Sequence, residues 1–342
     1  MRYLGSKASM APAIYQILAA NHAGPSVCDP FGGLAVVGGY LRGQGCHVVS
    51  GDILRFAHLF QVSRLELNEV PDFIKVRRAL DLHPSESVLK AVNNGPEVEG
   101  WLVTNYADER RFFTRSNALA IERCWHCIEQ WDRDGLLSRS ERAYLYSALI
   151  GSMDKVANTA GTYYAYLKGW HRKALRPFRL EEPVIHSGPE GCAVLCDAEQ
   201  LVGTSDFDVV YIDPPYNRRS YARYYHLPES IALGRRGPVA GIAGMPLIVN
   251  GESQFNRVSK AEDALVRLVA RARCTLLVVH YAEGGLLSRA TIRRVLTERG
   301  SVSEYEFRVR RYTSQKRQSS VDQWIMILHL GSRSDRNRTG VL

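Results

Sequence analysis

The sequence predicts an α/β fold in which a doubly wound sheet is interrupted by a mainly helical insertion. Three observations support this prediction. Short apolar runs that end in carboxylates alternate with helical stretches near the start of the chain. Strand signals then become rare after about residue 67, and the alternation returns near residue 193.

The first part of the chain has the order of elements that opens a doubly wound sheet. Residues 8–22 have helical spacing, and a short strand over 26–31 is followed by two glycines. A second helical stretch covers 34–41, and the β-branched run 46–50 ends in Gly51-Asp52. Another helix is expected to begin near Ile53.

The middle of the chain is expected to be helical. Helical patterns cover 72–82, 86–93, 116–134 and 139–150, with few strand signals between them. We therefore expect a mainly helical insertion at about 67–184.

The last part returns to strands. Strands are expected at 193–196, 207–212 and 274–280, with a helix at 260–273. Two further strands are expected to pair in antiparallel fashion, at 304–310 and 323–330. The predicted division is a first α/β part at 1–66, the insertion at 67–184, a second α/β part at 185–331 and a disordered polar tail at 332–342.

The composition is that of a globular protein with a substantial core. Of the 342 residues, 45% are hydrophobic and 23% are charged. No apolar run reaches the roughly 18 residues that a membrane span needs. The first seven residues lack the apolar segment of a signal peptide, so a cytoplasmic location is expected.

The net charge of +9 favours an acidic partner. Residues 155–179 and 308–317 contain several basic residues and no acidic ones, and both segments include aromatic residues. This mixture suits contacts to phosphates combined with stacking on bases. The alternative is a basic face that only contacts water.

The seven cysteines predict neither a disulfide scaffold nor a zinc site. Cys124 and Cys127 have the spacing of half a metal site, but the other close pair, Cys192 and Cys196, lies in a predicted strand. A structural zinc site needs four correctly spaced ligands. We expect buried thiols on a helix and no bound metal.

Four carboxylates follow predicted strands, namely Asp29, Asp52, Asp197 and Asp213. Ligands of an open α/β sheet bind beyond the carboxyl ends of the strands, so these side chains are expected at one edge. The alternative for each is a helix N-cap.

The glycines after Asp29 allow a ligand to approach the backbone closely, because neither has a Cβ. Their spacing does not fit the G-x-G-x-x-G pattern of dinucleotide sites, and the chain has no P-loop sequence. The carboxylate of Asp52, at the end of the second strand, suits the hydroxyl groups of a ribose.

The stretch D-P-P-Y at residues 213–216 ends a buried strand in an unusual way. Pro214 and Pro215 cannot continue a hydrogen-bonded ladder, and they stiffen the turn. An aromatic ring, Tyr216, and several arginines follow directly. The alternative interpretation is a rigid surface turn.

Together these motifs resemble the class alpha (Dam-type) S-adenosylmethionine-dependent adenine-N6 DNA methyltransferases. The motifs occur in the order of that class: residues 2–7, then D-P-F-G-G at 29–33, a long insertion, and D-P-P-Y at 213–216. The resemblance covers most of the chain. It implies a Rossmann-like methyltransferase sheet with an antiparallel last strand, S-adenosylmethionine as cofactor and duplex DNA as substrate.

The resemblance also implies roles for individual residues. The implied catalytic residues are Asp213, Pro214, Pro215 and Tyr216. The implied cofactor-binding residues are Tyr3, Lys7, Asp29, Phe31, Gly32, Asp52, Asp197 and Asp213. Asp213 and the carbonyl of Pro214 would accept hydrogen bonds from the adenine amine, while Tyr216 would stack on a base flipped out of the duplex.

The expected DNA-facing residues come from the basic segments and from the stretch after Tyr216. They are Lys168, Arg172, Lys173, Arg176, Arg218, Arg219, Arg223, Arg311, Lys316 and Arg317.

Several alternatives remain open at this point. Cytosine-N4 methylation uses the same geometry, but the first motif residue is then usually Ser rather than Asp213. Methylation of RNA or of a protein glutamine is a further possibility, the latter usually with Asn at this position. A catalytically inactive DNA-binding relative is an alternative from a different class.

Overall fold

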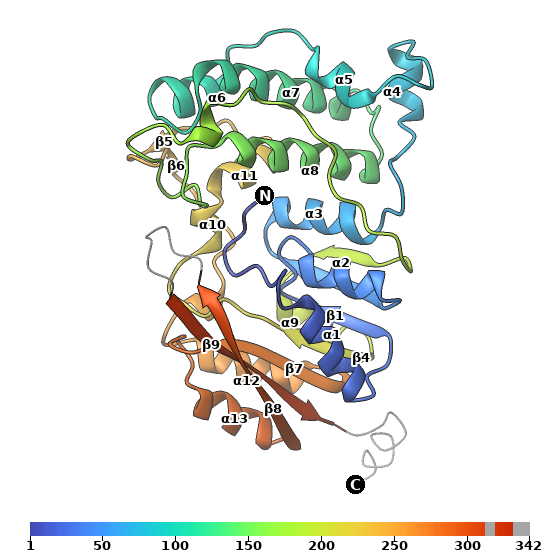
Figure 1. Cartoon of the computed structure of the whole chain (residues 1–342), viewed down its shortest axis with the longest axis vertical. Helices are drawn as coiled ribbons and strands as arrows, with labels where there is room; N and C mark the ends of the chain where they lie inside the picture. Colours follow the sequence, from blue (N-terminus) through green and yellow to red (C-terminus); the bar gives the residue numbers. More distant parts are fainter. Residues whose placement is uncertain (312–318, 331–342) are drawn as a thin grey trace. The chain divides into compact units, whose positions relative to one another are not determined.

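The computed structural model describes residues 1–311 and 319–330, and its internal contacts divide the chain into two compact units (Figure 1). The sheet unit comprises Lys7–Ile53, Gly188–Ser220 and Glu252–Leu342. The helical unit comprises Met1–Ser6, Leu54–Ser187 and Tyr221–Gly251. The division at 66/67 and 184/185 that the sequence suggests remains a prediction, and the tail 332–342 lies outside the described residues.

The described part of the sheet unit contains a seven-stranded sheet with the order β3-β2-β1-β4-β7-β9-β8. Its strands are β1 (Ser26–Asp29), β2 (His47–Asp52), β3 (Cys192–Leu195), β4 (Phe207–Ile212), β7 (Cys274–Ala282), β8 (Ser301–Arg311) and β9 (Ser319–His329). The first five in this spatial order are parallel, whereas β9 runs antiparallel to both of its neighbours. The predicted doubly wound sheet with an antiparallel last strand is confirmed.

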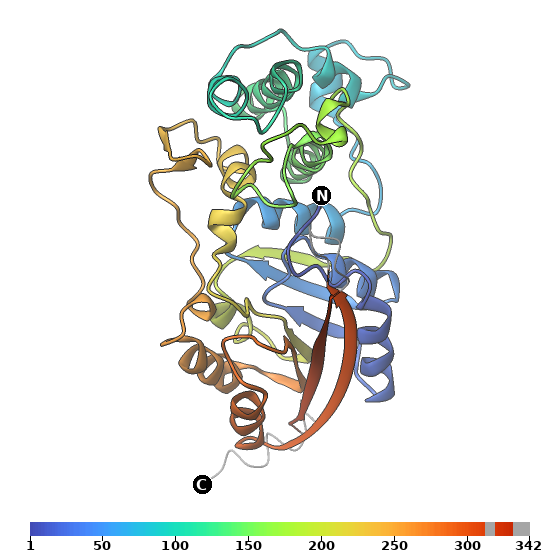
Figure 2. The same ribbon diagram turned by 60° about the vertical axis from the view of Figure 1, so that its left-hand side comes forward.

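Helices cover both faces of this sheet. The helical elements of the unit are α1 (Ala11–Ala20), α2 (Val36–Gly43), α9 (Ala198–Leu201), η3 (Gln254–Asn256), α12 (Ala261–Arg271) and α13 (Arg289–Thr297). Figure 2 shows α12 and α13 on one face and α1 and α2 on the other. Leu265 and Leu268 of α12 and Ile292 of α13 pack in a core with Val210 of β4, because both helices have one apolar stripe.

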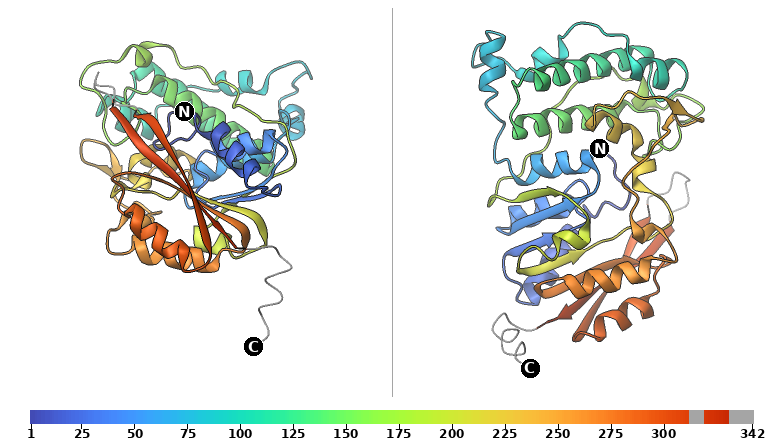
Figure 3. Two further views of the ribbon diagram at one scale, coloured as in Figure 1. Left: turned by 60° about the horizontal axis from the view of Figure 1, so that its bottom comes forward. Right: turned by 180° about the vertical axis from the view of Figure 1, so that it is seen from behind.

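The helical unit is built around two long antiparallel helices, α7 (Arg115–Arg133) and α8 (Arg139–Val156), which run side by side (Figure 3). Thr114 caps α7, and Ser138 forms a capping box with Glu141 at the start of α8. The other elements are α3 (Arg55–Leu65), α4 (Ile74–Ala79), α5 (Val88–Asn93), α6 (Trp101–Val103), η1 (Thr104–Asp108), η2 (Arg172–Leu175), α10 (Tyr221–Tyr224), α11 (His226–Ala232), β5 (Val239–Ala240) and β6 (Met245–Pro246). No helix among the described residues is long and apolar enough to cross a membrane.

The cysteines of α7 are placed as the sequence predicts. Cys124 and Cys127 are buried free thiols, and burial raises the pKa of Cys124 to about 12 and the pKa of Cys127 to about 11. In the described ranges, no group of three or more His, Cys, Asp or Glu side chains is arranged to hold a metal ion.

The N-terminus of α3 depends on a carboxylate from another helix of the same unit. Its own N-cap, Leu54, makes no side-chain cap, and the N–H groups of Arg55 and Phe56 donate to the two carboxylate oxygens of Glu229, each at 3.0 Å. The carboxylate also suits the positive end of the helix dipole. Glu229 on α11 therefore fixes the start of α3.

We expect Glu229→Ala to lower the free energy of unfolding by about 2 kcal/mol, because two N–H groups lose their acceptor. Glu229→Gln should cost less, since the amide keeps one acceptor oxygen. Urea unfolding measures both, with Glu69→Ala, an exposed residue of the same unit, as control. Equal stability of Glu229→Ala and the control would show that the cap contributes nothing.

Candidate active site

The carboxyl ends of four parallel strands bring the four predicted carboxylates to one edge of the sheet. Asp29 ends β1, Asp52 ends β2, Asp197 follows β3 and Asp213 follows β4. Because the strand order is β3-β2-β1-β4, the carboxylates follow one another along the edge as Asp197, Asp52, Asp29 and Asp213. The structure therefore brings together residues that are far apart in the sequence.

A buried ion pair lies at the β4 end of this edge. The Lys7 ammonium is 2.7 Å and 2.5 Å from the two carboxylate oxygens of Asp213, and the two side chains are 5% and 16% exposed. The carbonyl of Lys7 accepts from the N–H groups of Met10 and Ala11, which fixes Lys7 just ahead of α1. The ammonium also lies 5.4 Å from the centre of the Tyr216 ring. Lys7 is thus held at three points.

Asp29 lies within the electrostatic reach of this pair. Burial, and then the negative charge of Asp213, raise the pKa of Asp29 to about 8. Burial also raises the pKa of Asp213, and the Lys7 ammonium opposes that rise. At neutral pH, Asp29 is therefore mostly protonated, while Lys7 stabilises the ionised form of Asp213.

The loop after Asp29 is tightly folded against the neighbouring strand. One carboxylate oxygen of Asp29 accepts from the N–H of Phe31 at 3.3 Å. The N–H of Gly32 donates to the carbonyl of Gly51 in β2 at 3.0 Å, and Gly33 has a φ of +51°, in the left-handed region that glycine tolerates. The loop therefore stays close to the edge of the sheet.

The other two carboxylates are in more open surroundings. Asp52 is half-buried, and its main-chain carbonyl accepts from the N–H of Cys196 at 3.1 Å. Asp197 is exposed and caps α9 by accepting from the N–H of Glu199 at 2.9 Å. The N-cap alternative is thus correct for Asp197, and a cofactor-binding role for this residue stays a prediction.

Aromatic side chains support Tyr216. Its ring packs edge-on against Tyr281 of β7, with ring centres 5.7 Å apart, and Tyr281 in turn packs against Trp324 of β9 at 5.4 Å. The carbonyl of Tyr216 accepts from the N–H of Leu286 at 2.9 Å. Phe31 packs edge-on against Phe255 at 5.3 Å. These partners of Tyr216 and Phe31 were not predicted from the sequence.

A buried hydrogen-bond chain crosses three strands next to the ion pair. The Tyr211 hydroxyl and Nδ1 of His280 are 2.8 Å apart, and Nε2 of His280 and Oε1 of Gln323 are 2.8 Å apart. Burial and the nearby Lys7 ammonium lower the pKa of His280 well below its usual value, so the ring is neutral. The sequence signal for this chain is weak: His280 interrupts the apolar run 276–282 of β7, but Gln323 is one of several polar residues in β9.

Tyr3 lies in the helical unit, where aromatic contacts hold it. Its ring stacks on Tyr225 with centres 4.9 Å apart and contacts Tyr221 at 5.4 Å. The adjacent Leu4 donates through its N–H to the Tyr225 hydroxyl at 2.6 Å. A cofactor-binding role for Tyr3 remains a prediction.

The predicted DNA-facing residues are divided between the two units. Lys168, Arg172, Arg176 and Arg223 are exposed on the helical unit, and Arg218 and Arg219 are exposed on the sheet unit. Lys173 is half-buried and donates to the carbonyl of Asp154 at 3.1 Å. Arg311 belongs to β8, whereas Lys316 and Arg317 lie outside the described residues.

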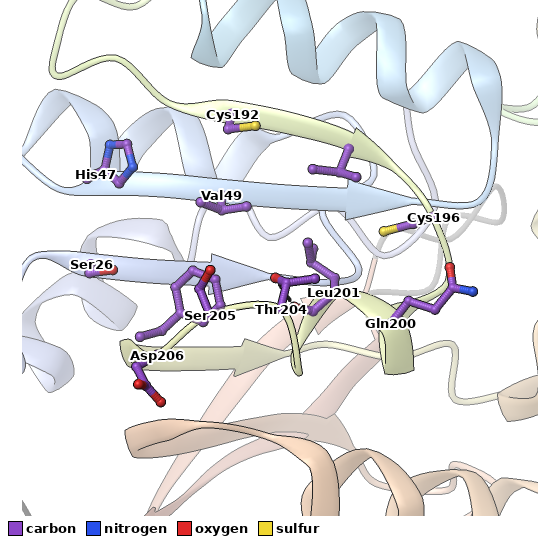
Figure 4. A pocket seen from close by; sticks show the side chains of 12 residues that line it. Ser26, His47, Val49, Cys192, Cys196, Gln200, Leu201, Thr204, Ser205 and Asp206 are labelled. Carbon is purple, nitrogen blue, oxygen red and sulfur yellow. Dashed lines mark hydrogen bonds between the residues drawn. The ribbon is translucent and has the colours of Figure 1, made fainter. Parts of the chain in front are cut away.

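A cavity of about 610 Å³ opens near β3, on the sheet unit. Figure 4 shows His47 and Cys192 along the strands and Cys196 and Gln200 near their carboxyl ends. None of the predicted cofactor-binding residues lines this cavity. We assign it no role in the site formed by the carboxylates.

The raised pKa of Asp29 gives the stability a specific pH dependence. The folded state binds more protons than the unfolded chain between about pH 4 and pH 8, so stability decreases as pH rises through about 8. We expect the melting temperature of the wild type to fall between pH 6 and 9 relative to that of Asp29→Asn, which cannot ionise. Thermal unfolding across this range, with Asp263→Asn on the exposed face of α12 as control, measures the effect. Parallel curves for wild type and Asp29→Asn would contradict the prediction.

Removing the ammonium should leave Asp213 without its partner. We expect Lys7→Met to cost about 3 kcal/mol or more at pH 8, and less at pH 5, where the carboxyl can take up a proton. Urea unfolding at both pH values measures this. Lys260→Met is the matched control, because Lys260 also precedes a helix of the sheet unit but is exposed. A loss that does not change with pH would show that packing, and not charge, is what Lys7 supplies.

Several known proteins of related sequence are named as methyltransferases or modification methylases. The chain is 29% identical to the type II methyltransferase M.FokI of Planomicrobium okeanokoites, over 94% of this chain and 51% of the relative. It is 30% identical to the modification methylase StsI of Streptococcus sanguinis, over 87% of this chain and 46% of the relative. The type II methyltransferase M.NlaIII of Neisseria lactamica is 28% identical, over 92% of this chain and 93% of the relative. The chain thus spans about half the length of the first two and nearly all of the third.

Family membership follows from a match that extends over most of the chain and includes every part of the carboxylate edge. Residues 3–272 match the family described as D12 class N6 adenine-specific DNA methyltransferase. That range contains Asp29, Asp52, Asp197 and Asp213 as well as Lys7. The chain belongs to the D12 class of N6 adenine-specific DNA methyltransferases.

Proposed function

We propose that this protein transfers a methyl group from S-adenosylmethionine to N6 of an adenine that is flipped out of duplex DNA. The observation that carries the proposal is the Asp213 carboxylate at the end of β4, held by Lys7 and followed by two prolines and Tyr216. Membership of the D12 class supports the same reaction.

The residues at the edge of the sheet suit S-adenosylmethionine. This cofactor supplies a methyl group on a positively charged sulfur, and it also carries an ammonium group and a ribose diol. Four carboxyl groups share this edge with one ammonium, and with Asp29 protonated the carboxylates still outnumber it, which makes the edge attractive to a cation. Asp52, half-buried at the end of β2, suits the ribose hydroxyls, and the folded loop of Phe31 and Gly32 suits the methionine part. Asp197 and Tyr3 are the further proposed contacts.

The role proposed for Asp213 follows from the weak nucleophilicity of the adenine amine. The lone pair of that nitrogen is delocalised into the ring, so it needs acceptors that localise the pair toward the methyl donor. An ionised Asp213 and the main-chain carbonyl of Pro214 can each accept one N–H of the amine. Lys7 favours the ionised form of this carboxylate, and Pro214 and Pro215 keep the turn rigid.

The role proposed for Tyr216 is to stack on the extruded base. Flipping a nucleotide out of a duplex costs a few kcal/mol, and stacking on an aromatic ring returns about 1–3 kcal/mol. The edge-on contact with Tyr281 limits rotation of the Tyr216 ring, so little entropy is lost when a base stacks on it.

Duplex DNA is the proposed partner. The exposed Lys168, Arg172 and Arg176 of the helical unit would contact phosphates, as would Arg218, Arg219 and Arg223 after the D-P-P-Y motif. In this proposal the insertion at 67–184 contributes to target recognition, and the enzyme acts in the cytoplasm.

Transfer of labelled methyl from S-adenosylmethionine to mixed-sequence unmethylated duplex DNA tests the proposal. We expect label in N6-methyladenine, and we expect Asp213→Ala to reduce the rate at least 10²–10³-fold, roughly the loss seen when a group that stabilises a transition state is removed. Asp206→Ala is the control, because Asp206 lies at the opposite end of β4 and pairs with Arg273.

The other outcomes are equally informative. Label in N4-methylcytosine would agree with the proposed site geometry but would show that the target base is cytosine and not adenine. Label in RNA or in a protein glutamine, with none in DNA, would overturn the substrate. No label from a protein that still binds DNA would favour an inactive DNA-binding relative.

A further inference from the structure

The most exposed large aliphatic side chains of the described residues occur together in one short segment. Ile242, Leu247 and Ile248 are 79%, 67% and 72% exposed, the three highest values for large hydrophobic side chains in the described part of the chain. They belong to the hairpin of β5 and β6 and to the residues that follow it. Figure 2 shows this hairpin, in gold, standing out from the helices of the helical unit. Clustered exposed apolar side chains usually mark a contact surface.

The hairpin is rigidly held through its main chain. The carbonyl of Gly244 accepts from the Tyr106 hydroxyl at 2.5 Å, and the carbonyl of Gly241 accepts from Nε of Arg110 at 3.1 Å. Nε2 of His226 lies 3.1 Å from the carbonyl of Ala243. Three side chains of the helical unit therefore contact three main-chain carbonyls of the turn that presents Ile242.

The two glycines of this turn are required by its conformation. Gly241 and Gly244 have φ values of +70° and +63°. A Cβ on Gly244 would also lie 3.1 Å from atoms of Tyr106 and Arg110. Together with the hydrogen bonds, these constraints preorganise the hairpin, so that little conformational entropy is lost when it meets a partner.

Arg111 and Phe112, which follow Arg110 in the chain, contact the basic and aromatic loop 159–171. Arg111, the neighbour of Arg110, donates to the carbonyl of Lys168 at 3.2 Å. The ring of Phe112 packs against Tyr163 and Tyr166, with ring centres 6.2 Å and 5.2 Å apart. Residues 110 and 111 thus tie the hairpin and the loop together within one unit.

The chemistry of the two segments is complementary. The loop exposes Lys168 together with the rings of Tyr164 and Trp170. Residues 237–251, which include the hairpin, contain no charged residue. A cation can pair with a phosphate, whereas an uncharged aliphatic side chain suits apolar parts of the bases, such as a thymine methyl group or the faces of unstacked bases.

We propose that the hairpin inserts Ile242, with Leu247 and Ile248 beside it, into the base stack of the duplex where the adenine leaves it. This inference rests on the proposed function and assigns the step that keeps the base extruded. A flipped nucleotide leaves a gap in the stack, and aliphatic side chains of DNA-bending proteins enter such gaps. Contacts from Lys168 and its neighbours to phosphates would hold the duplex against the hairpin.

The test begins with the site that the wild type methylates in mixed-sequence DNA. Two oligonucleotide duplexes contain that site, one with thymine opposite the target adenine and one with an abasic position there. We expect Ile242→Ser to reduce the rate on the normal duplex about 10–100-fold, and to be within about 3-fold of the wild type on the abasic duplex, where less pairing and stacking must be broken. Leu247→Ser should show the same pattern with a smaller loss.

Ile74→Ser is the matched control, because Ile74 is a 61% exposed aliphatic residue of the same unit that lies on α4. It should match the wild type on both duplexes. Melting temperatures of all three variants within a few degrees of the wild type confirm that folding is unchanged. An equal loss of rate for Ile242→Ser on both duplexes, or wild-type rates on both, would overturn the proposal that Ile242 acts as a wedge in the base stack.

Sedimentation tests whether a second copy of the chain, and not DNA, covers this surface. A wild type that dimerises and an Ile242→Ser variant that does not would assign the hairpin to contacts between copies of the chain, and would overturn the wedge. Failure of the wild type itself to methylate DNA would overturn the proposed function and the wedge with it. If the wild type methylates DNA but the variants do not show the expected pattern, the wedge alone is overturned.

Discussion

The buried ion pair between Lys7 and Asp213, with Asp29 beside it, is the constraint on which the proposed site depends. Removing one ammonium and two carboxyl groups from water costs several kcal/mol for each ion unless the charges are paired. The ion pair provides one partner, and the second carboxyl, Asp29, avoids the cost by keeping its proton. This arrangement requires β1 and β4 to be neighbours and requires Lys7 to lie four residues ahead of the start of α1.

This arrangement also determines how the edge can respond to a cationic ligand. A positive charge near Asp29 would lower the pKa of that carboxyl, so binding would release a proton in the range where Asp29 titrates. Asp213 is different, because Lys7 already favours its ionised form. Asp29 is therefore suited to balance the charge of a cofactor, whereas Asp213 is suited to accept hydrogen bonds from a neutral base.

The sequence predicted the sheet and its four carboxylates but not the contacts between them. Carboxyl ends of parallel strands share an edge, so alternation of apolar runs with helices was enough to bring Asp29 and Asp213 together. The pairing of Lys7 with Asp213, 206 positions away, depends on where α1 packs, and a local pattern contains no information on that. The chain of Tyr211, His280 and Gln323 depends on the register of three strands. Short elements such as α9 and η1 have too few residues to show a period.

The hairpin of β5 and β6 is conformationally specified by its backbone. Glycines at 241 and 244 allow the turn, and Tyr106, Arg110 and His226 hold main-chain carbonyls. None of these contacts involves the side chain of Ile242, so the fold of the hairpin does not explain why an aliphatic residue occupies its tip. Exposing such a side chain to water gains nothing from the hydrophobic effect, and a serine or asparagine would suit an exposed turn better. The aliphatic character of the tip is therefore explained by what it contacts in a complex, and the stacked bases beside a cationic loop provide an apolar surface of that kind.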